Sequence, residues 1–238
     1  GRENVHSFSK IIIMNIKNYE SLIFDCDGVL LNSNFIKTNS FRKVLSNFNE
    51  EAIEELISFH KKNGGLSRYK KFQHFIENIA PKYNIDSISN NHLDDLDFLC
   101  ESFAESVFKD LVKCEVTPDL EKLRNKTINQ KWFIVSGGDQ NELREVFSKK
   151  GLDHFFDGGI YGSTKSKYEI LIKLLKEKKI TKNGIFFGDS ILDYDVSKKF
   201  KYDFTFISEW TDLLDWENYC RKNKITYVRF LRDFMNVH

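Results

Sequence analysis

The sequence predicts an α/β protein with a Rossmann-like, doubly wound parallel sheet and an inserted α-helical cap domain. Three observations lead to this prediction. Short apolar segments alternate with helical patterns over most of the chain, which is typical of parallel sheets. Each apolar segment ends in small, polar or acidic residues, as strands do where they enter a turn. One stretch, residues 34–113, shows helical patterns alone.

Five segments are expected to form strands, because each is a short apolar run that ends at a turn. They are residues 21–26, 131–137, 159–162, 184–189 and 203–208. Between them, Asp139 with Glu142 predicts a helix start, and Gly151 predicts its end. Thr117 followed by Pro118 predicts another helix start. The last residues, 209–238, are expected to form a terminal helix and tail without chemistry.

Residues 34–113 are expected to form a helical bundle inserted after the first strand. Apolar side chains recur there at helical spacing in four groups, and Pro81 is predicted to end the third helix. The groups lie at residues 41–48, 53–57, 72–79 and 96–107. We therefore expect a core made of residues 15–33 and 114–238 and a cap made of residues 34–113.

The bulk composition indicates an ordinary globular protein of 238 residues, with 41% hydrophobic and 30% charged residues. A net charge of +1 gives no reason to expect nucleic acid or a membrane as partner. The 4 cysteines form no CxxC pair, so we expect reduced thiols in a cytoplasmic protein. Residues 1–13 are interpreted as a polar leader without a function, with Met14 as a candidate native start, and the oligomeric state is left open.

The stretch FDCDGVL, residues 24–30, is the most informative part of the sequence. Asp25 and Asp27 are two positions apart, which places them on the same side of an extended chain. Two carboxylates at the end of an apolar strand repel each other and are costly to desolvate. A divalent cation would offset this cost, and Mg²⁺ prefers carboxylate oxygens. Ligands also bind at the carboxyl ends of strands in open α/β sheets, so a magnesium site is favoured over two solvated acids.

Two later segments carry groups that suit a phosphoryl oxygen. Ser136 and Gly137 end a predicted strand before a helix, where a hydroxyl and backbone amides can bind an anion. Lys167 opens the helix after residue 166 and could neutralise negative charge on the phosphoryl group. Lys165 is the alternative for this role.

The segment GDSILD, residues 188–193, ends another predicted strand with two acids. Asp189 lies where a carboxylate from a neighbouring strand could meet Asp25 on one cation. Asp193 follows about one helical turn later. The four segments are therefore expected to gather at one edge of the sheet.

In order along the chain, these segments resemble the four motifs of the haloacid dehalogenase-like superfamily. FDCDGVL resembles the first motif, DxDGxL/V, and IVSGG, SKYEIL and GDSILD resemble the second, third and fourth. The resemblance implies that Asp25 attacks phosphorus and forms an aspartyl-phosphate. It implies that Asp27 protonates the leaving oxygen and later activates water.

The resemblance also implies a ligand set for the phosphoryl group and for Mg²⁺. Asp27 would bind the cation through its backbone carbonyl, and Asp193 would bind through water or orient the site. The phosphate-binding residues would be Ser136, Gly137 and Lys167, and the metal-binding residues Asp25, Asp27, Asp189 and Asp193.

The insertion between the first and second motifs resembles the C1 cap of this superfamily, which closes over the site and excludes water. Gly64 and Gly65 interrupt its helical pattern. The segment GLSR, residues 65–68, resembles the GVSR cap loop of β-phosphoglucomutases and related sugar-phosphate phosphatases. This implies that Arg68 contacts the anionic part of the substrate. The alternative is a solvated loop between two helices.

The expected function is that of a Mg²⁺-dependent phosphomonoesterase acting on a small phosphorylated metabolite, such as a sugar phosphate or a phosphoglycolate-like acid. The first alternative is a sugar phosphomutase of the β-phosphoglucomutase type. Against it, Lys37 stands where those enzymes have a histidine, and Gly188 precedes Asp189 where they have a glutamate. Dehalogenases resemble this core but lack the second acid, Asp27. A further alternative is a non-catalytic metabolite-binding protein, although all the expected reactive groups are present.

Overall fold

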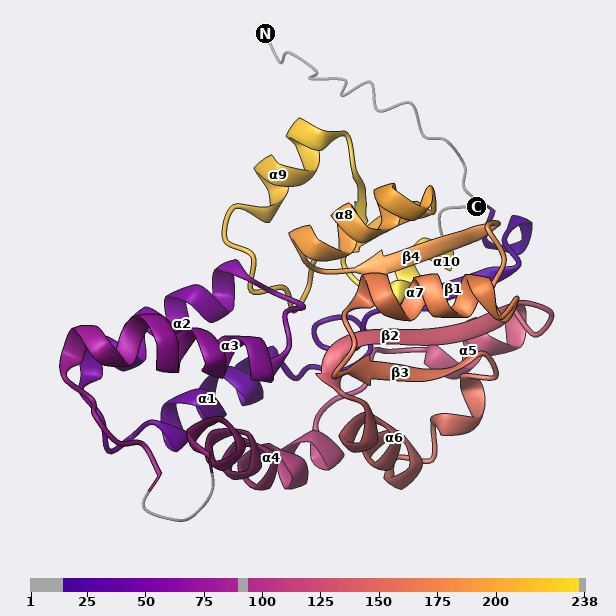
Figure 1. The fold of residues 1–238 in the computed structure, drawn as a ribbon. Helices are drawn as coiled ribbons and strands as arrows, with labels where there is room; N and C mark the ends of the chain where they lie inside the picture. The colour runs from indigo at the N-terminus through magenta and orange to yellow at the C-terminus, as the bar shows by residue number, and fades with distance from the viewer. Residues whose placement is uncertain (1–14, 90–93, 236–238) are drawn as a thin grey trace, which may run out of the picture.

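The computed structural model describes residues 15–89 and 94–235, and its centre is a six-stranded parallel sheet of order β3-β2-β1-β4-β5-β6 (Figure 1). The strands are β1 (Ser21–Phe24), β2 (Lys131–Asp139), β3 (Gly159–Ser163), β4 (Gly184–Gly188), β5 (Asp203–Ile207) and β6 (Thr226–Val228). The five predicted strands are confirmed. The sixth, β6, was not predicted, and the expectation of only a helix and a tail after residue 208 is wrong. The predicted α/β fold class is confirmed.

Helices cover both faces of the sheet, as a doubly wound fold requires. Alternate strand residues point to opposite faces, so each face packs on its own set of helices. Phe24 and Trp132 pack on one face, with ring centroids 4.7 Å apart, together with α5, α6 and α10. Ile23 and Phe186 pack on the other face with α7, α8 and α9. These helices are α5 (Leu120–Lys126), α6 (Gln140–Lys149), α7 (Lys167–Lys176), α8 (Ile191–Phe200), α9 (Trp216–Asn223) and α10 (Leu231–Met235).

The described residues between β1 and β2 form helices joined by turns and loops. The helices that precede α5 are α1 (Asn34–Val44), α2 (Glu50–Lys62), α3 (Arg68–His74) and α4 (Asp95–Lys113), with a π-helical turn at Phe75–Ile79 and a 3₁₀ turn at Ala80–Tyr83. Short 3₁₀ turns also occur in the core, at Ile16–Asn18 and Asp153–Phe155. Three of the four predicted helical groups lie in helices as expected, and the first does so only in part, because α1 ends at Val44 and residues 45–48 form a turn. Pro81 does not end the third helical segment, because it lies in the first turn of the 3₁₀ element, where a missing N–H is tolerated.

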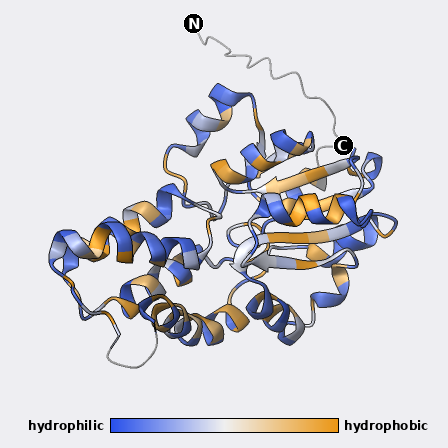
Figure 2. Ribbon diagram, in the orientation of Figure 1, coloured by the Kyte–Doolittle hydropathy of each residue, from blue (hydrophilic) through white to orange (hydrophobic). Residues whose placement is uncertain are grey.

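The cap has an aromatic centre of its own and lies at the carboxyl ends of the strands, to which the strand arrows in Figure 1 point. Phe41 contacts both Phe72 and Phe103, with ring centroids 5.1 and 4.5 Å away. Figure 2 shows the cap helices alternating between polar and apolar residues, as expected for helices that bury one face. No helix in the described ranges combines the length and the apolar character needed to cross a membrane.

The chain leaves the core and returns to it through two segments that run side by side. Leu31 and Val116 form an antiparallel bridge, and the Thr117 N–H donates to the Leu30 carbonyl at 2.8 Å. This hydrogen bond corrects the helix start predicted at Thr117 and Pro118, because Thr117 pairs with the outgoing segment. Helix α5 begins only after Asp119, which has a left-handed φ of 59°. The division into residues 15–33, 34–113 and 114–238 stays a prediction.

Candidate active site

Three of the predicted carboxylates meet at the ends of two neighbouring strands. Asp25 follows β1, and Asp189 and Asp193 follow β4, which pairs with β1 in parallel register. One oxygen from each carboxylate lies within 4.8 Å of the other two, and all three residues are buried. We expected a carboxylate from a neighbouring strand to meet Asp25, and the structure brings Asp189 and Asp25 together at this edge of the sheet. A glycine at position 188 is needed here, since a Cβ would lie 2.3 Å from the Cβ of Asp193.

Lys167 supplies a cation to this cluster. It is the first residue of α7, whose start is fixed by a capping box between Ser166 and Glu169. Its Nζ lies 2.9 Å from Asp25 Oδ1 and 2.5 Å from Asp193 Oδ1. Lys165, the sequence alternative, is exposed to solvent.

The electrostatics of the cluster suit a divalent cation. Burial, and then Asp193, raise the pKa of Asp25 to about 7, although Lys167 opposes the shift. Burial and the nearby Asp25 also raise the pKa of Asp189 well above its usual range. Three carboxylates and one ammonium carry a formal charge of −2. An oxygen-rich donor set with this charge fits a hard cation such as Mg²⁺.

The members of the cluster are held by different partners. Both oxygens of Asp193 are engaged, Oδ1 by Lys167 and Oδ2 by the Ser190 hydroxyl at 2.7 Å. Asp193 therefore fixes the position of Lys167, whatever further role it has. Asp189 accepts a 3.0 Å hydrogen bond from Asn34, which also donates to the Trp210 carbonyl. The segment after β5, for which no chemistry was predicted, thus touches the site.

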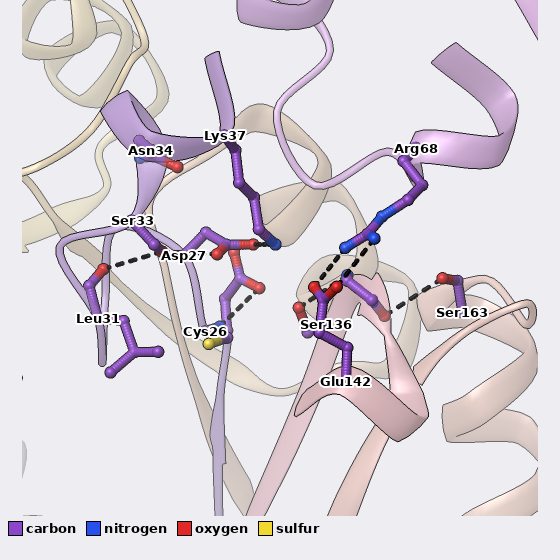
Figure 3. A network of polar contacts seen from close by, with 12 residues as sticks. Cys26, Asp27, Leu31, Ser33, Asn34, Lys37, Arg68, Ser136, Glu142 and Ser163 are labelled. Atoms are coloured by element: carbon purple, nitrogen blue, oxygen red, sulfur yellow. Dashed lines mark hydrogen bonds and ion pairs between the residues drawn. The ribbon is translucent and has the colours of Figure 1, made fainter. Parts of the chain in front are cut away.

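The carboxylate of Asp27 is engaged away from this cluster. Lys37 Nζ and Ser33 Oγ each lie 2.6 Å from one of its oxygens. Figure 3 draws both contacts as dashed lines. Burial would raise the pKa of Asp27, but Lys37 and Ser33 outweigh it and lower the pKa. Ser33 is the N-cap of α1 and Lys37 lies one turn later on the same side of the helix. The four-residue spacing of Ser33 and Lys37 is the signal in the sequence for these partners of Asp27. The comparison of motifs did not identify them.

The turn after β2 carries the predicted phosphate-binding residues. Ser136 is fully buried, and its hydroxyl accepts a 3.0 Å hydrogen bond from the Gly138 N–H. Gly137 faces the cap, because a Cβ added there would lie 2.0 Å from the carbonyl oxygen of Gly65. Gly65 has a φ of +82°, a left-handed conformation that favours glycine. The cap loop therefore rests directly on this turn, and the structure has the closed arrangement.

Between core and cap lies a cavity of about 280 Å³. Its charged lining is divided by domain: every acidic side chain comes from the core segments, and every basic one comes from residues 34–113. The acids are Asp25, Asp27, Asp189, Asp195 and Asp212, and the basic residues are Lys37, His60, Lys61, Lys62, Arg68 and Lys71. A phosphate ester bound here would meet acidic side chains of the core and basic side chains of the cap.

Arg68, predicted to contact the substrate, is tied to the core in the closed arrangement. Its guanidinium forms a two-pronged ion pair with Glu142 (Figure 3), with Nη1 3.0 Å from Oε2. The guanidinium also lies 4.5 Å from the centroid of the Phe103 ring. The neighbouring Tyr69 donates a 2.8 Å hydrogen bond to Asp139. These two contacts join the start of α3 to the start of α6. A contact between Arg68 and substrate stays a prediction.

The sequence matches one family model over most of its length. The model describes haloacid dehalogenase-like hydrolases and matches residues 22–207, a range that runs from β1 through β5. The chain belongs to the haloacid dehalogenase-like hydrolase family. This membership identifies the protein as an enzyme and confirms the family that the four motifs suggested. No curated protein matches it.

Solved structures support the fold of this haloacid dehalogenase-like protein. A hydrolase from Pseudomonas syringae has a TM-score of 0.66 at 17% identity, covering 91% of this chain and 96% of that one. A β-phosphoglucomutase from Clostridium difficile has a TM-score of 0.65 at 18% identity, covering 90% and 92%. A protein named "predicted phosphatase" from Clostridium acetobutylicum also scores 0.65 at 18% identity, covering 91% and 96%. At these identities the likeness shows the fold alone.

Proposed function

We propose that this protein is a Mg²⁺-dependent phosphomonoesterase that hydrolyses a small phosphorylated metabolite through an aspartyl-phosphate on Asp25. The observation that carries the proposal is the hydrogen bonding of the Asp25 carboxylate, which lines the cavity. Its Oδ1 accepts from the Cys26 N–H at 2.8 Å and lies 2.9 Å from Lys167 Nζ. No hydrogen bond reaches Oδ2 from the described residues, so this oxygen is left for attack on phosphorus.

The other residues complete a two-step transfer. In the first step, Asp25 attacks phosphorus and the leaving oxygen takes a proton from Asp27. In the second step, Asp27 takes a proton from water, and the water oxygen attacks the phosphoryl group and frees Asp25. Lys37 favours the ionised form of Asp27 that the second step needs. Lys167 and the Gly137 turn would hold the phosphoryl oxygens. Mg²⁺, when bound by the acidic cluster with Asp27, would neutralise negative charge on the phosphoryl group and the nucleophile.

The first experiment replaces the nucleophile. Asp25→Asn should reduce hydrolysis of p-nitrophenyl phosphate below detection, because uncatalysed phosphate-monoester hydrolysis is among the slowest known reactions. The matched control is Asp153→Asn, which makes the same change at an exposed acid in a 3₁₀ turn of the core. Acid-quenched wild-type enzyme should carry one phosphoryl group on Asp25 by mass spectrometry. Wild-type turnover in Asp25→Asn would refute the assignment.

The cation is tested separately from activity. Mg²⁺ should raise the thermal midpoint of the wild-type protein, because a ligand that binds only the folded state stabilises it. EDTA should reverse the rise, and Asp189→Asn should abolish it. A thermal midpoint of the wild-type protein that does not change when Mg²⁺ is added would contradict the metal site.

A sugar phosphomutase is the second candidate, supported by the GLSR loop and the likeness to the β-phosphoglucomutase from C. difficile. The two activities differ in the group that accepts the phosphoryl from Asp25, which is water in one and a sugar hydroxyl in the other. Incubation with glucose 1-phosphate and a bisphosphate activator distinguishes them. Release of inorganic phosphate supports the hydrolase, and formation of glucose 6-phosphate supports the mutase.

A further inference from the structure

A buried lysine that lines the cavity has no carboxylate partner among the described residues. Of the basic residues that line it from the cap, Lys37 pairs with Asp27 and Arg68 pairs with Glu142. Lys71 is only 4% exposed, yet among the residues that the structure describes no carboxylate lies within ion-pair distance of its Nζ. Within residues 15–89 and 94–235, the hydrogen-bond partner of this Nζ is His60 Nδ1, at 2.8 Å. Within the described part of the chain, the side chain therefore brings to the cavity wall a buried amine that has no ion-pair partner.

Three cap helices hold this ammonium group in place. In its charged form Lys71 only donates hydrogen bonds, so His60 Nδ1 accepts from it in that form. His60 Nε2 then carries the proton and donates to the Thr38 hydroxyl at 2.9 Å. Burial, and then Lys71, lower the pKa of His60 to about 2, so the ring stays neutral. One of the three Lys71 N–H groups is used by His60, which leaves two for a ligand in the cavity.

The position is costly for a cation without a ligand. Burial, and then Lys37, lower the pKa of Lys71 to about 7, while Asp27, Asp212 and Asp25 act in the opposite direction. An anionic oxygen entering the cavity would offset this cost by supplying the missing partner. Lys71 belongs to the cap side of the cavity lining, whereas the acidic cluster belongs to the core side.

We propose that Lys71 binds a second anionic group of the substrate, a carboxylate or a second phosphate on the leaving group, and so selects phosphate esters that carry one. The inference rests on the proposed function and narrows its substrate class. The reacting phosphoryl group lies at Asp25, and the second anion lies against the cap at Lys71. A cavity of about 280 Å³ restricts the ester to a small molecule.

The test uses pairs of esters that differ in this one group. 2-Phosphoglycolate is compared with 2-hydroxyethyl phosphate, and glucose 1,6-bisphosphate with glucose 1-phosphate. In one pair or the other the wild-type enzyme should prefer the doubly anionic member, and the pair that shows the preference identifies the anion. Lys71→Met should lower kcat/KM for that member roughly 10- to 100-fold, the usual range for a hydrogen bond to a charged group. The other member should change by less than about twofold.

Two further variants show whether the positive charge of Lys71 causes the preference for the doubly anionic ester. Lys71→Arg restores the cation and should recover part of the preference. Lys70→Met makes the same change at an exposed lysine of the same helix and should leave both members unaffected. An equal loss for both members in Lys71→Met would indicate a purely structural role and would overturn the proposal. So would an unchanged preference.

Calorimetry separates this proposal from the proposed function. Affinities for each pair are measured with Mg²⁺ in the Asp25→Asn protein, with and without Lys71→Met. Tighter binding of the doubly anionic member, lost in the double variant, supports the subsite even if no ester is turned over by the wild-type enzyme. Equal affinities for the two members of both pairs would overturn the subsite, although hydrolysis of esters would still support the phosphatase.

Discussion

Replacing Arg68 by alanine should destabilise the folded protein by about 4 kcal/mol, because the Glu142 carboxylate would stay buried without its cation. The two side chains are 5% and 8% exposed, so water cannot replace the lost partner. Removing one member of a buried ion pair costs about 3–5 kcal/mol. The contact of the guanidinium with the Phe103 ring adds roughly 0.5–2 kcal/mol, part of which the smaller side chain loses as well. For a chain of 238 residues, 4 kcal/mol corresponds to a fall of about 8–16 °C in the thermal midpoint.

Urea unfolding followed by circular dichroism measures this loss, and the chain offers a matched control. Arg42 pairs with Glu54 at the surface, where the side chains are 37% and 51% exposed, so Arg42→Ala should cost less than about 1 kcal/mol. The double variant Arg68→Met, Glu142→Leu removes both charges and should lie within about 1 kcal/mol of wild type. A loss below about 1 kcal/mol for Arg68→Ala would refute the reasoning. A double variant as unstable as the sum of its single changes would refute it too.

Two further predictions concern the Asp27 ion pair and the contact between the cap loop and the core. Lys37 lowers the pKa of Asp27, which must be ionised to take a proton from water when the aspartyl-phosphate is hydrolysed. Lys37→Met should raise that pKa and move the acidic limb of the pH profile for aspartyl-phosphate hydrolysis, measured in single turnovers, to higher pH. Lys37→Arg should keep the limb near its wild-type position, and an unmoved limb in Lys37→Met would contradict this. Gly137→Ala places a Cβ 2.0 Å from the Gly65 carbonyl oxygen, so the cap loop must shift, and steady-state kinetics should show kcat/KM lower by about 100-fold. A wild-type value in Gly137→Ala would show that the closed arrangement is not needed for turnover.

The strands of the core could be predicted from sequence because they are buried runs of apolar residues that end at turns. β6 lacks that signal, since Thr226 and Tyr227 are exposed and Val228 is only partly buried at the edge of the sheet. The start of α5 was misplaced for a different reason. Thr117 and Pro118 form a good local helix start, but a long-range hydrogen bond to Leu30 decides the conformation of Thr117.

Some residues of the candidate site could also be predicted from sequence, and others could not. Asp25, Asp189 and Lys167 could be placed together from sequence, since strand ends and the helix starts beside them meet at one edge of a parallel sheet. Lys37 and Lys71 could not, because their role depends on how the cap docks against the core. Helical periodicity shows only that these residues lie on helices. It does not show which helix face meets the sheet.

The paired segments at Leu31 and Val116 have a consequence for how such proteins diversify. Because the insertion begins and ends at neighbouring points, its length and shape are free to vary while the strands keep their places. A genetic exchange of this insertion would alter which molecules reach Asp25 and would leave the reacting groups where they are. Chemistry and selectivity are thus inherited on separable stretches of one chain.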